Sequence, residues 1–123
     1  MRIGVAGLGG MGYVHARNVL ELTGATLVAV GSTRAGRADE VARKLGVRAA
    51  SYDELLAADD IDAIVVAARS IDHAWVGGDV LRAGKHLFLE KPGATKLADH
   101  DALVAEAGAR PAQVVQVLSL IHI

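Results

Sequence analysis

The chain has 123 residues, of which 52% are hydrophobic and 22% are charged, a length and composition that suit one globular domain. A net charge of −1 excludes a global attraction to nucleic acid or to an acidic lipid surface. The absence of cysteine excludes disulfides and thiolate metal sites, and no spacing of His, Asp and Glu suggests a metal site of another kind. Because neither a signal peptide nor an apolar run of about 18 residues is present, we expect a cytoplasmic protein without a membrane partner.

Segments that predict strands alternate with segments that predict helices along the whole chain. The expected strands span residues 2–6, 25–30, 47–50, 61–68, 86–90 and 113–118, and the expected helices span 11–22, 34–45, 52–58, 72–83 and 96–107. Gly46 is expected to end the second helix, a capping box from Ser51 to Glu54 to begin the third, and Thr95 to cap the last. Residues 61–68 are almost all apolar, as in strands buried on both faces. The alternation predicts an α/β fold with a doubly wound parallel sheet.

The first expected strand runs directly into a glycine cluster that fits the pattern G-x-G-x-x-G. The six residues of this cluster are Gly7, Leu8, Gly9, Gly10, Met11 and Gly12. Between a strand and a helix, the pattern predicts a site for the pyrophosphate of a dinucleotide. The first glycine permits a tight turn, the second lets the phosphates approach, the third lets the helix pack closely, and the helix N-terminus offers free N–H groups. A glycine-rich connection without a ligand is the alternative.

Residues after the second expected strand bear on which nicotinamide cofactor would bind. NAD-binding domains of this kind carry an Asp or Glu about 20 residues beyond the glycines, where it binds the ribose 2′-hydroxyl. Here that position is Ser32, followed by Thr33 and Arg34 and, one turn on, by Arg37. Hydroxyls and arginines suit a 2′-phosphate, which an acid would repel. The pattern favours NADP over NAD, although the two arginines also suit a solvated helix face beside Asp39.

A second motif lies at the end of the fifth expected strand, where residues 84–92 read Gly-Lys-His-Leu-Phe-Leu-Glu-Lys-Pro. With the glycine motif, with His15 just beyond it, and with the spacing of Ser32 and Arg37, this stretch resembles the glucose-fructose oxidoreductase / inositol dehydrogenase / MocA family. The resemblance covers residues 3–117 and implies the N-terminal Rossmann domain of that family. It also marks Ser32 and Arg37 as similar to the NADP-using members.

The resemblance implies that Glu90, Lys91 and Pro92 lie where the nicotinamide meets the substrate. Lys91 would be the catalytic residue that hydrogen-bonds the reacting hydroxyl. Physical reasoning agrees, because a lysine at the carboxyl end of a parallel strand faces the ligand crevice and its ammonium stabilises a developing alkoxide. The proline would keep Lys91 extended. A surface lysine before a turn proline is the alternative.

One segment departs from the pattern of that family. After the fourth strand the family has Thr-Pro-Asn or similar and then a histidine, whereas residues 68–73 here are Ala-Arg-Ser-Ile-Asp-His. His73 matches and Ser70 could replace the asparagine, but Ala68 and Arg69 do not match the Thr-Pro. We expect Ala68, Ser70 and His73 to lie along the cofactor, with a purely structural role at the start of a helix as the alternative for His73.

Members of that family have a second α/β domain that closes over the substrate and supplies an Asp and a His, the His acting as general base. Nothing in residues 1–117 corresponds to this domain, so we expect them to form the NAD(P)-binding half of an oxidoreductase with negligible turnover by itself. Residues 118–123 read Leu-Ser-Leu-Ile-His-Ile and match the translation of CTG TCT CTT ATA CAC ATC, a transposase end sequence used to build sequencing libraries. We expect this tail to be adapter-derived, with a natural apolar strand as the alternative.

The function that these motifs favour is hydride exchange between NAD(P) and a sugar, a polyol or a related secondary alcohol or ketone. The parent protein would therefore bind a nicotinamide dinucleotide and a small sugar-like substrate, and it could be an oligomer. The alternative is a non-catalytic dinucleotide-binding module with a redox-sensing or regulatory role. The glycine motif suits both readings, whereas a lysine at the nicotinamide favours the enzyme.

Overall fold

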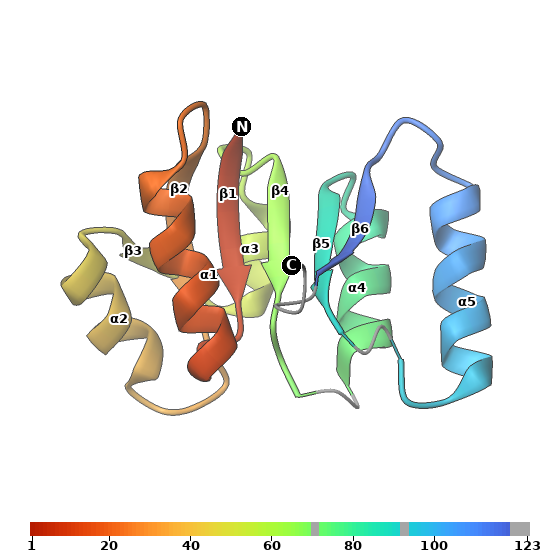
Figure 1. The fold of residues 1–123 in the computed structure, drawn as a ribbon, viewed down its shortest axis with the longest axis horizontal. Coiled ribbons are helices and arrows are strands. Elements are labelled where there is room, and N and C mark those ends of the chain that lie inside the picture. Colours follow the sequence, from red (N-terminus) through yellow and green to blue (C-terminus); the bar gives the residue numbers. More distant parts are fainter. Residues whose placement is uncertain (70–71, 92–93, 119–123) are drawn as a thin grey trace, which may run out of the picture.

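The computed structural model describes residues 1–69, 72–91 and 94–118. A six-stranded sheet runs through them in the order β3-β2-β1-β4-β5-β6, and each strand pairs in parallel with its neighbours. The strands are β1 (Arg2–Ala6), β2 (Thr26–Gly31), β3 (Arg48–Ala49), β4 (Ala63–Val66), β5 (His86–Glu90) and β6 (Val115–Leu118). The helices are α1 (Gly10–Glu21), α2 (Arg37–Leu45), α3 (Tyr52–Ala57), α4 (His73–Arg82) and α5 (Leu97–Gly108). The predicted doubly wound parallel sheet is confirmed (Figure 1).

Helices cover both faces of this sheet. On one face, α1 and α2 pack over a cluster that includes Val5 and Val65. On the other, α3, α4 and α5 pack over a cluster that includes Val66 and Leu89. Neighbouring residues of β4 thus enter opposite cores, and all four of its residues are buried, as the apolar run predicted.

Local signals set most helix ends. Gly46 ends α2 in the left-handed conformation with φ 71°, and Ser51 and Glu54 form both hydrogen bonds of a capping box at the start of α3. Two expectations were wrong. α2 begins at Arg37 rather than at residue 34, because Gly36 before it is left-handed (φ 75°) and interrupts the helical backbone. The residue that caps α5 is Lys96, which lacks a side-chain capping bond, rather than Thr95.

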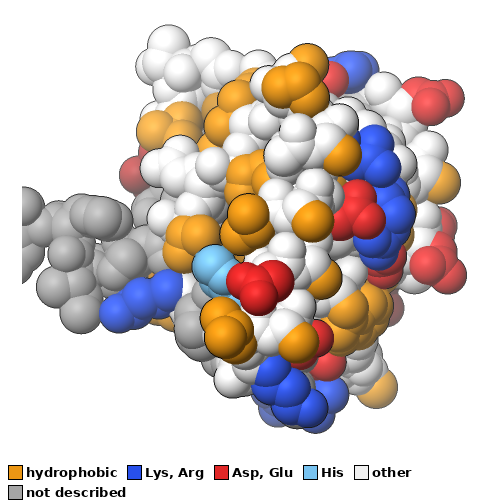
Figure 2. Space-filling view, turned by 90° about the vertical axis from the view of Figure 1, so that its right-hand side faces the viewer, with side chains coloured by type: hydrophobic (Ala, Val, Ile, Leu, Met, Phe, Trp, Pro, Cys, Tyr) orange, Lys and Arg blue, Asp and Glu red, His pale blue; other side chains and the backbone are white. Residues whose placement is uncertain are grey.

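The outermost helix, α5, is the least buried of the described helices that flank the sheet. Leu103 is its one buried residue, whereas the side chains of Leu97 and Val104 are 77% and 55% exposed. Figure 2 looks at this side of the molecule and shows hydrophobic side chains interspersed with charged ones across its surface. Within the described ranges, no helix is long and apolar enough to span a bilayer.

Candidate functional site

The candidate site lies at the carboxyl ends of β1 and β4. From β1 the chain first adds β2 and β3 on one side, and it later adds β4, β5 and β6 on the other side. The strand order therefore reverses between β1 and β4. Ligands of open α/β sheets bind outside the carboxyl ends of the strands at such a switch point. In Figure 1 the loops of this edge lie along the bottom of the molecule, beneath the arrowheads of β1 and β4.

The glycine turn between β1 and α1 is close-packed at two of its glycines. Gly7 has φ 101°, and a Cβ there would lie 2.5 Å from the backbone of Ala67. A Cβ on Gly12 would lie 1.8 Å from the Gly7 carbonyl oxygen, so the turn itself, more than the strand, excludes a side chain at this position. The structure therefore requires both residues to be glycine, whatever the turn binds.

The other two glycines of the turn face open space. Added Cβ atoms on Gly9 and Gly10 would meet no atom within 4 Å. Gly9 is also the N-cap of α1, where no side chain of the described residues caps the helix and the first turn holds no acidic residue. The first N–H groups of a twelve-residue helix and its positive dipole end therefore remain available to an anion.

A hollow of about 270 Å³ extends from this turn along the sheet edge. Its walls come from three loops and from the starts of α3 and α4. The lining residues are Gly7, Leu8, Gly9, Ser32, Thr33, Tyr52, Ala67, Ala68, Arg69, Asp72 and Trp75. The sequence-predicted residues Gly7, Leu8, Gly9, Ser32, Thr33 and Ala68 are thus brought together.

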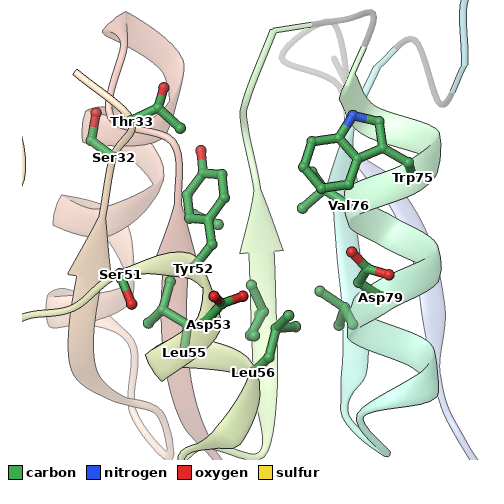
Figure 3. A pocket seen from close by; sticks show the side chains of 13 residues that line it. Ser32, Thr33, Ser51, Tyr52, Asp53, Leu55, Leu56, Trp75, Val76 and Asp79 are labelled. Carbon is green, nitrogen blue, oxygen red and sulfur yellow. The ribbon is translucent and has the colours of Figure 1, made fainter.

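A second hollow of about 340 Å³ adjoins the first one, sharing Ser32, Thr33, Tyr52 and Trp75 with it. Figure 3 shows Tyr52 of α3 and Trp75 of α4 on opposite walls of this space. Burial, and to a smaller extent the charge of Asp72, raises the pKa of the Tyr52 phenol, so it stays neutral at physiological pH. An apolar space between two aromatic residues suits a flat ring.

Asp72 orients the aromatic wall on the α4 side. Its carboxylate accepts a hydrogen bond from the Trp75 indole at 3.0 Å and another from Arg69 Nε at 3.0 Å. The indole hydrogen bond, together with Arg69, keeps the pKa of the Asp72 carboxyl below its usual value. The carboxylate is therefore charged at neutral pH and holds the indole in place.

The two arginines that were expected to favour NADP lie in different environments. Arg34 is exposed, and its backbone N–H donates to Ser32 Oγ at 3.1 Å. Arg37 is partly buried: its Nε donates to the Leu8 carbonyl at 2.8 Å, its Nη1 pairs with Glu40, and its guanidinium lies 5.5 Å from the centre of the Tyr13 ring. Arg37 therefore braces the glycine turn, whereas Arg34 is free to face a ligand.

The loop after β4 was expected to follow the cofactor. Ala68 lines the first hollow, and Ser70 lies outside the described residues. His73 is buried, and its Nε2 donates to the Ala68 carbonyl at 2.7 Å. The histidine thus supports the loop from within, and its role toward a cofactor stays a prediction.

Glu90 ends β5 on the same edge of the sheet, and Lys91 follows it. Glu90 Oε2 lies 2.6 Å from Nε2 of His15 on α1, and Lys91 is exposed. Pro92 lies outside the described residues, as do Ser119–Ile123 of the tail, whereas Leu118 ends β6. Of the described residues, no group of three His, Asp or Glu side chains could hold a metal ion.

Sequence reasoning missed Tyr52, Asp72 and Trp75 as residues of the site. Tyr52 entered only as part of a capping segment, and Asp72 only as the start of a helix. Trp75 is the single tryptophan of the chain and is 54% exposed beside a hollow. The single tryptophan near the start of the expected helix 72–83 is the one sequence signal that could have indicated this side of the hollow.

Comparison with known families agrees with this geometry. Residues 1–118 match the model of the oxidoreductase family with an NAD-binding Rossmann fold. Among curated relatives, the chain is 39% identical over 108 residues to a myo-inositol 2-dehydrogenase of Thermotoga maritima, covering 86% of this chain and 32% of that protein. It is 41% identical over 95 residues to an NAD(+)-dependent scyllo-inositol 2-dehydrogenase of Bacillus subtilis, covering 75% and 28%.

Solved structures show the same relationship. A scyllo-inositol dehydrogenase from Lactobacillus casei, crystallised with NAD(H) and scyllo-inositol, superposes with a TM-score of 0.89 at 28% identity, covering 95% of this chain and 35% of that one. A myo-inositol dehydrogenase homologue from Sinorhizobium meliloti gives a TM-score of 0.91 at 31% identity, covering 96% and 36%. The chain spans about a third of the length of these relatives.

Proposed function

Because this chain belongs to the oxidoreductase family with an NAD-binding Rossmann fold, we propose that it is the cofactor-binding domain of a dehydrogenase. The whole enzyme transfers a hydride between a nicotinamide dinucleotide and a sugar, a polyol or a related secondary alcohol or ketone. The observation that carries the proposal is the uncapped N-terminus of α1, with Gly9 and Gly10 open in front of it at the switch point. The inositol substrates of the relatives support the substrate class.

Different residues at the carboxyl ends of the strands bind different parts of the cofactor. The N–H groups of Gly10, Met11 and Gly12 bind the pyrophosphate at the start of α1. Ser32, Thr33 and Arg34 surround the ribose next to the adenine. The aromatic walls formed by Tyr52 and Trp75 enclose the adenine ring, which has the flat apolar faces that this space accepts.

The other end of the cofactor lies at Glu90 and Lys91. The bound nicotinamide supplies or accepts the hydride. Lys91, exposed at the carboxyl end of β5, is the catalytic residue that donates a hydrogen bond to the reacting oxygen of the substrate. Its ammonium would stabilise the alkoxide charge on this oxygen, which develops when a carbonyl accepts a hydride or when a hydroxyl gives up its proton before the hydride leaves.

Titration of the purified chain with NADH tests this proposal. Trp75 is the only tryptophan and lines the hollow, so its fluorescence should be quenched saturably as NADH binds. ADP-ribose should compete, because most of the proposed contacts are to the ADP portion. Absence of saturable quenching up to about 1 mM NADH, the weakest affinity worth calling specific, would overturn the proposal.

We also propose that the domain prefers NADPH to NADH. Ser32, Thr33 and Arg34 line one hollow of about 300 Å³, and Arg34 supplies the positive charge that a 2′-phosphate needs. Asp39 and Glu54 line the same hollow and offset part of this attraction, so the expected preference is modest, about fivefold to tenfold.

Replacement of Arg34 should change the affinity for NADPH but not the affinity for NADH. Arg34→Ala should weaken NADPH binding about fivefold and leave NADH binding nearly unchanged, because only the former carries the 2′-phosphate. Arg43→Ala on α2, which removes an exposed arginine of the last helical turn, is the matched control and should change neither affinity. Equal affinities of the unmodified chain for NADH and NADPH would contradict the preference.

A further inference from the structure

A hydrogen bond between distant parts of the chain lies beside the proposed nicotinamide end of the site. Nε2 of His15 lies 2.6 Å from Oε2 of Glu90, and the two side chains are 15% and 12% exposed. The residues are 75 positions apart in the sequence. We call this contact the His15–Glu90 bridge.

The bridge joins the two elements that the proposed function needs to hold together. His15 is on α1, five residues beyond the start of the helix whose N-terminus faces the open glycines. Glu90 is the last residue of β5, and Lys91 follows it. Because β4 lies between β1 and β5 in the sheet, the backbone pairing of β5 does not connect it with β1 or α1, whereas the bridge connects the end of β5 with α1, the helix that follows the glycine turn.

The bridge also determines which partner the Glu90 carboxylate takes. Alternate residues of a strand point to opposite faces, so Glu90 lies on the same face as Phe88, which packs against the cluster beneath α1 and α2. There the carboxylate meets His15 rather than the neighbouring Lys91. A short hydrogen bond between partly buried, ionisable groups is stronger than an exposed one.

From this geometry we infer that His15 is a positioning residue, which holds Glu90 so that the end of β5 presents Lys91 to the nicotinamide half of the cofactor and to the substrate. This inference rests on the proposed function. His15 itself touches neither substrate nor cofactor in this role. It acts through Glu90 on the half of the dinucleotide that carries the nicotinamide, and it leaves the ADP half to the glycine turn and the aromatic walls.

The experiment compares two ligands and four chains. NADH and ADP-ribose are titrated into the unmodified chain, His15→Ala, His15→Gln and the control His100→Ala, which removes an exposed histidine of α5. We expect His15→Ala to weaken NADH binding about tenfold, because the nicotinamide end of the site at Glu90 and Lys91 loses its support. ADP-ribose does not reach that end, so its binding should change less than about twofold. His15→Gln should restore most of the NADH affinity, because its side-chain amide can donate to Glu90. The control should bind both ligands as the unmodified chain does.

Each outcome decides a separate question. If the unmodified chain binds neither ligand, the proposed function fails. If it binds both and His15→Ala binds NADH normally, or loses both ligands equally without rescue by His15→Gln, the inference is overturned and the bridge is merely structural.

A second variant covers the case in which His15→Ala does not fold, as judged by circular dichroism and thermal unfolding. Glu90→Ala then removes the bridge from its other end and should reproduce the selective loss of NADH affinity. Glu90→Gln keeps an oxygen that accepts from His15 and should restore most of the NADH affinity that Glu90→Ala loses. Equal NADH binding by Glu90→Ala and the unmodified chain would overturn the inference.

Discussion

The two edges of the sheet differ in how completely their polar groups are paired within the chain. At the amino edge, charged groups are matched within the chain: Arg2 pairs with Asp62 at 2.9 Å and Arg48 with Asp60 at 3.0 Å. The buried Lys85 ammonium there donates to two backbone carbonyls at 2.7 and 2.8 Å. At the carboxyl edge, Arg69 pairs with Asp72 and His15 with Glu90, but the N-terminus of α1 lacks a side-chain cap and two glycines face open space.

This difference shows how one sheet separates stability from binding. Polar groups that satisfy one another at the amino edge hold the strands and leave little for a ligand to contact. Donors that remain open at the carboxyl edge contribute little to folding, but they are available for an anion. Substitutions at the two edges should therefore affect stability and affinity separately, except where the glycine turn itself is close-packed.

The largest effect, on both stability and affinity, is expected in the close-packed glycine turn. Gly12→Ala places a Cβ 1.8 Å from the Gly7 carbonyl oxygen, so either the turn or α1 must move. We expect a loss of about 3 kcal/mol in the free energy of unfolding, the upper end for an added methyl group in a packed interior, and loss of NADH binding. Urea unfolding and NADH titration measure the two. Native stability with normal affinity would contradict the packing argument.

A smaller loss confined to stability is expected at the amino edge. Lys85→Met keeps the aliphatic stem but leaves the carbonyls of Ala58 and Ile61 without their donor. The free energy of unfolding should fall by about 2 kcal/mol, as for buried groups that lose a charged partner. The affinity for NADH, measured on the folded variant, should stay the same. A loss of NADH affinity in the folded variant would contradict the prediction that amino-edge substitutions affect stability alone.

At Gly9 a substitution is expected to lower the affinity for NADH and to leave stability nearly unchanged. A methyl group in Gly9→Ala meets no protein atom within 4 Å, so the unfolding temperature should change by no more than a few degrees. The same methyl group would stand in the path of the pyrophosphate, and the affinity for NADH should fall about tenfold. Gly24→Ala is unsuitable as a control because its φ of 84° would strain alanine; Gly108→Ala, on α5 and also without a close neighbour, is the matched control.

The smallest effect concerns the acid dependence of stability. The hydrogen bonds from Arg2 hold the pKa of the Asp62 carboxyl well below its usual value. The folded state therefore favours the ionised form, and this contribution is present above about pH 4 and is lost as the pH falls further. Asp62→Asn should flatten the fall of the unfolding temperature between about pH 5 and pH 2, and Asp59→Asn, at an exposed neighbour, serves as control. The NADH affinity at neutral pH should be unchanged in both variants.

Some features of the site could not be predicted from sequence because they depend on contacts between remote residues. Trp75 meets Tyr52 across a hollow formed by two different helices, and His15 meets Glu90 across 75 residues. Arg37 was predicted as a phosphate ligand from its charge, its position after Ser32 and the family resemblance, whereas the fold directs its guanidinium to the Leu8 carbonyl. Its role toward a cofactor stays a prediction, as do those of Glu90 and Lys91.

The sequence by itself determined the features that depend on neighbouring residues. The alternation of strands and helices, the Gly46 end of α2 and the capping box of α3 follow from residues within a few positions of one another. The glycine turn is also marked by its local pattern, although the packing of Gly7 against Ala67 comes from the fold. The tertiary structure decided the rest, from the brace formed by Arg37 to the aromatic walls and the His15–Glu90 bridge. The physical reason is that a backbone conformation is set locally, whereas the partner of a side chain is known only once the sheet order has brought distant segments together.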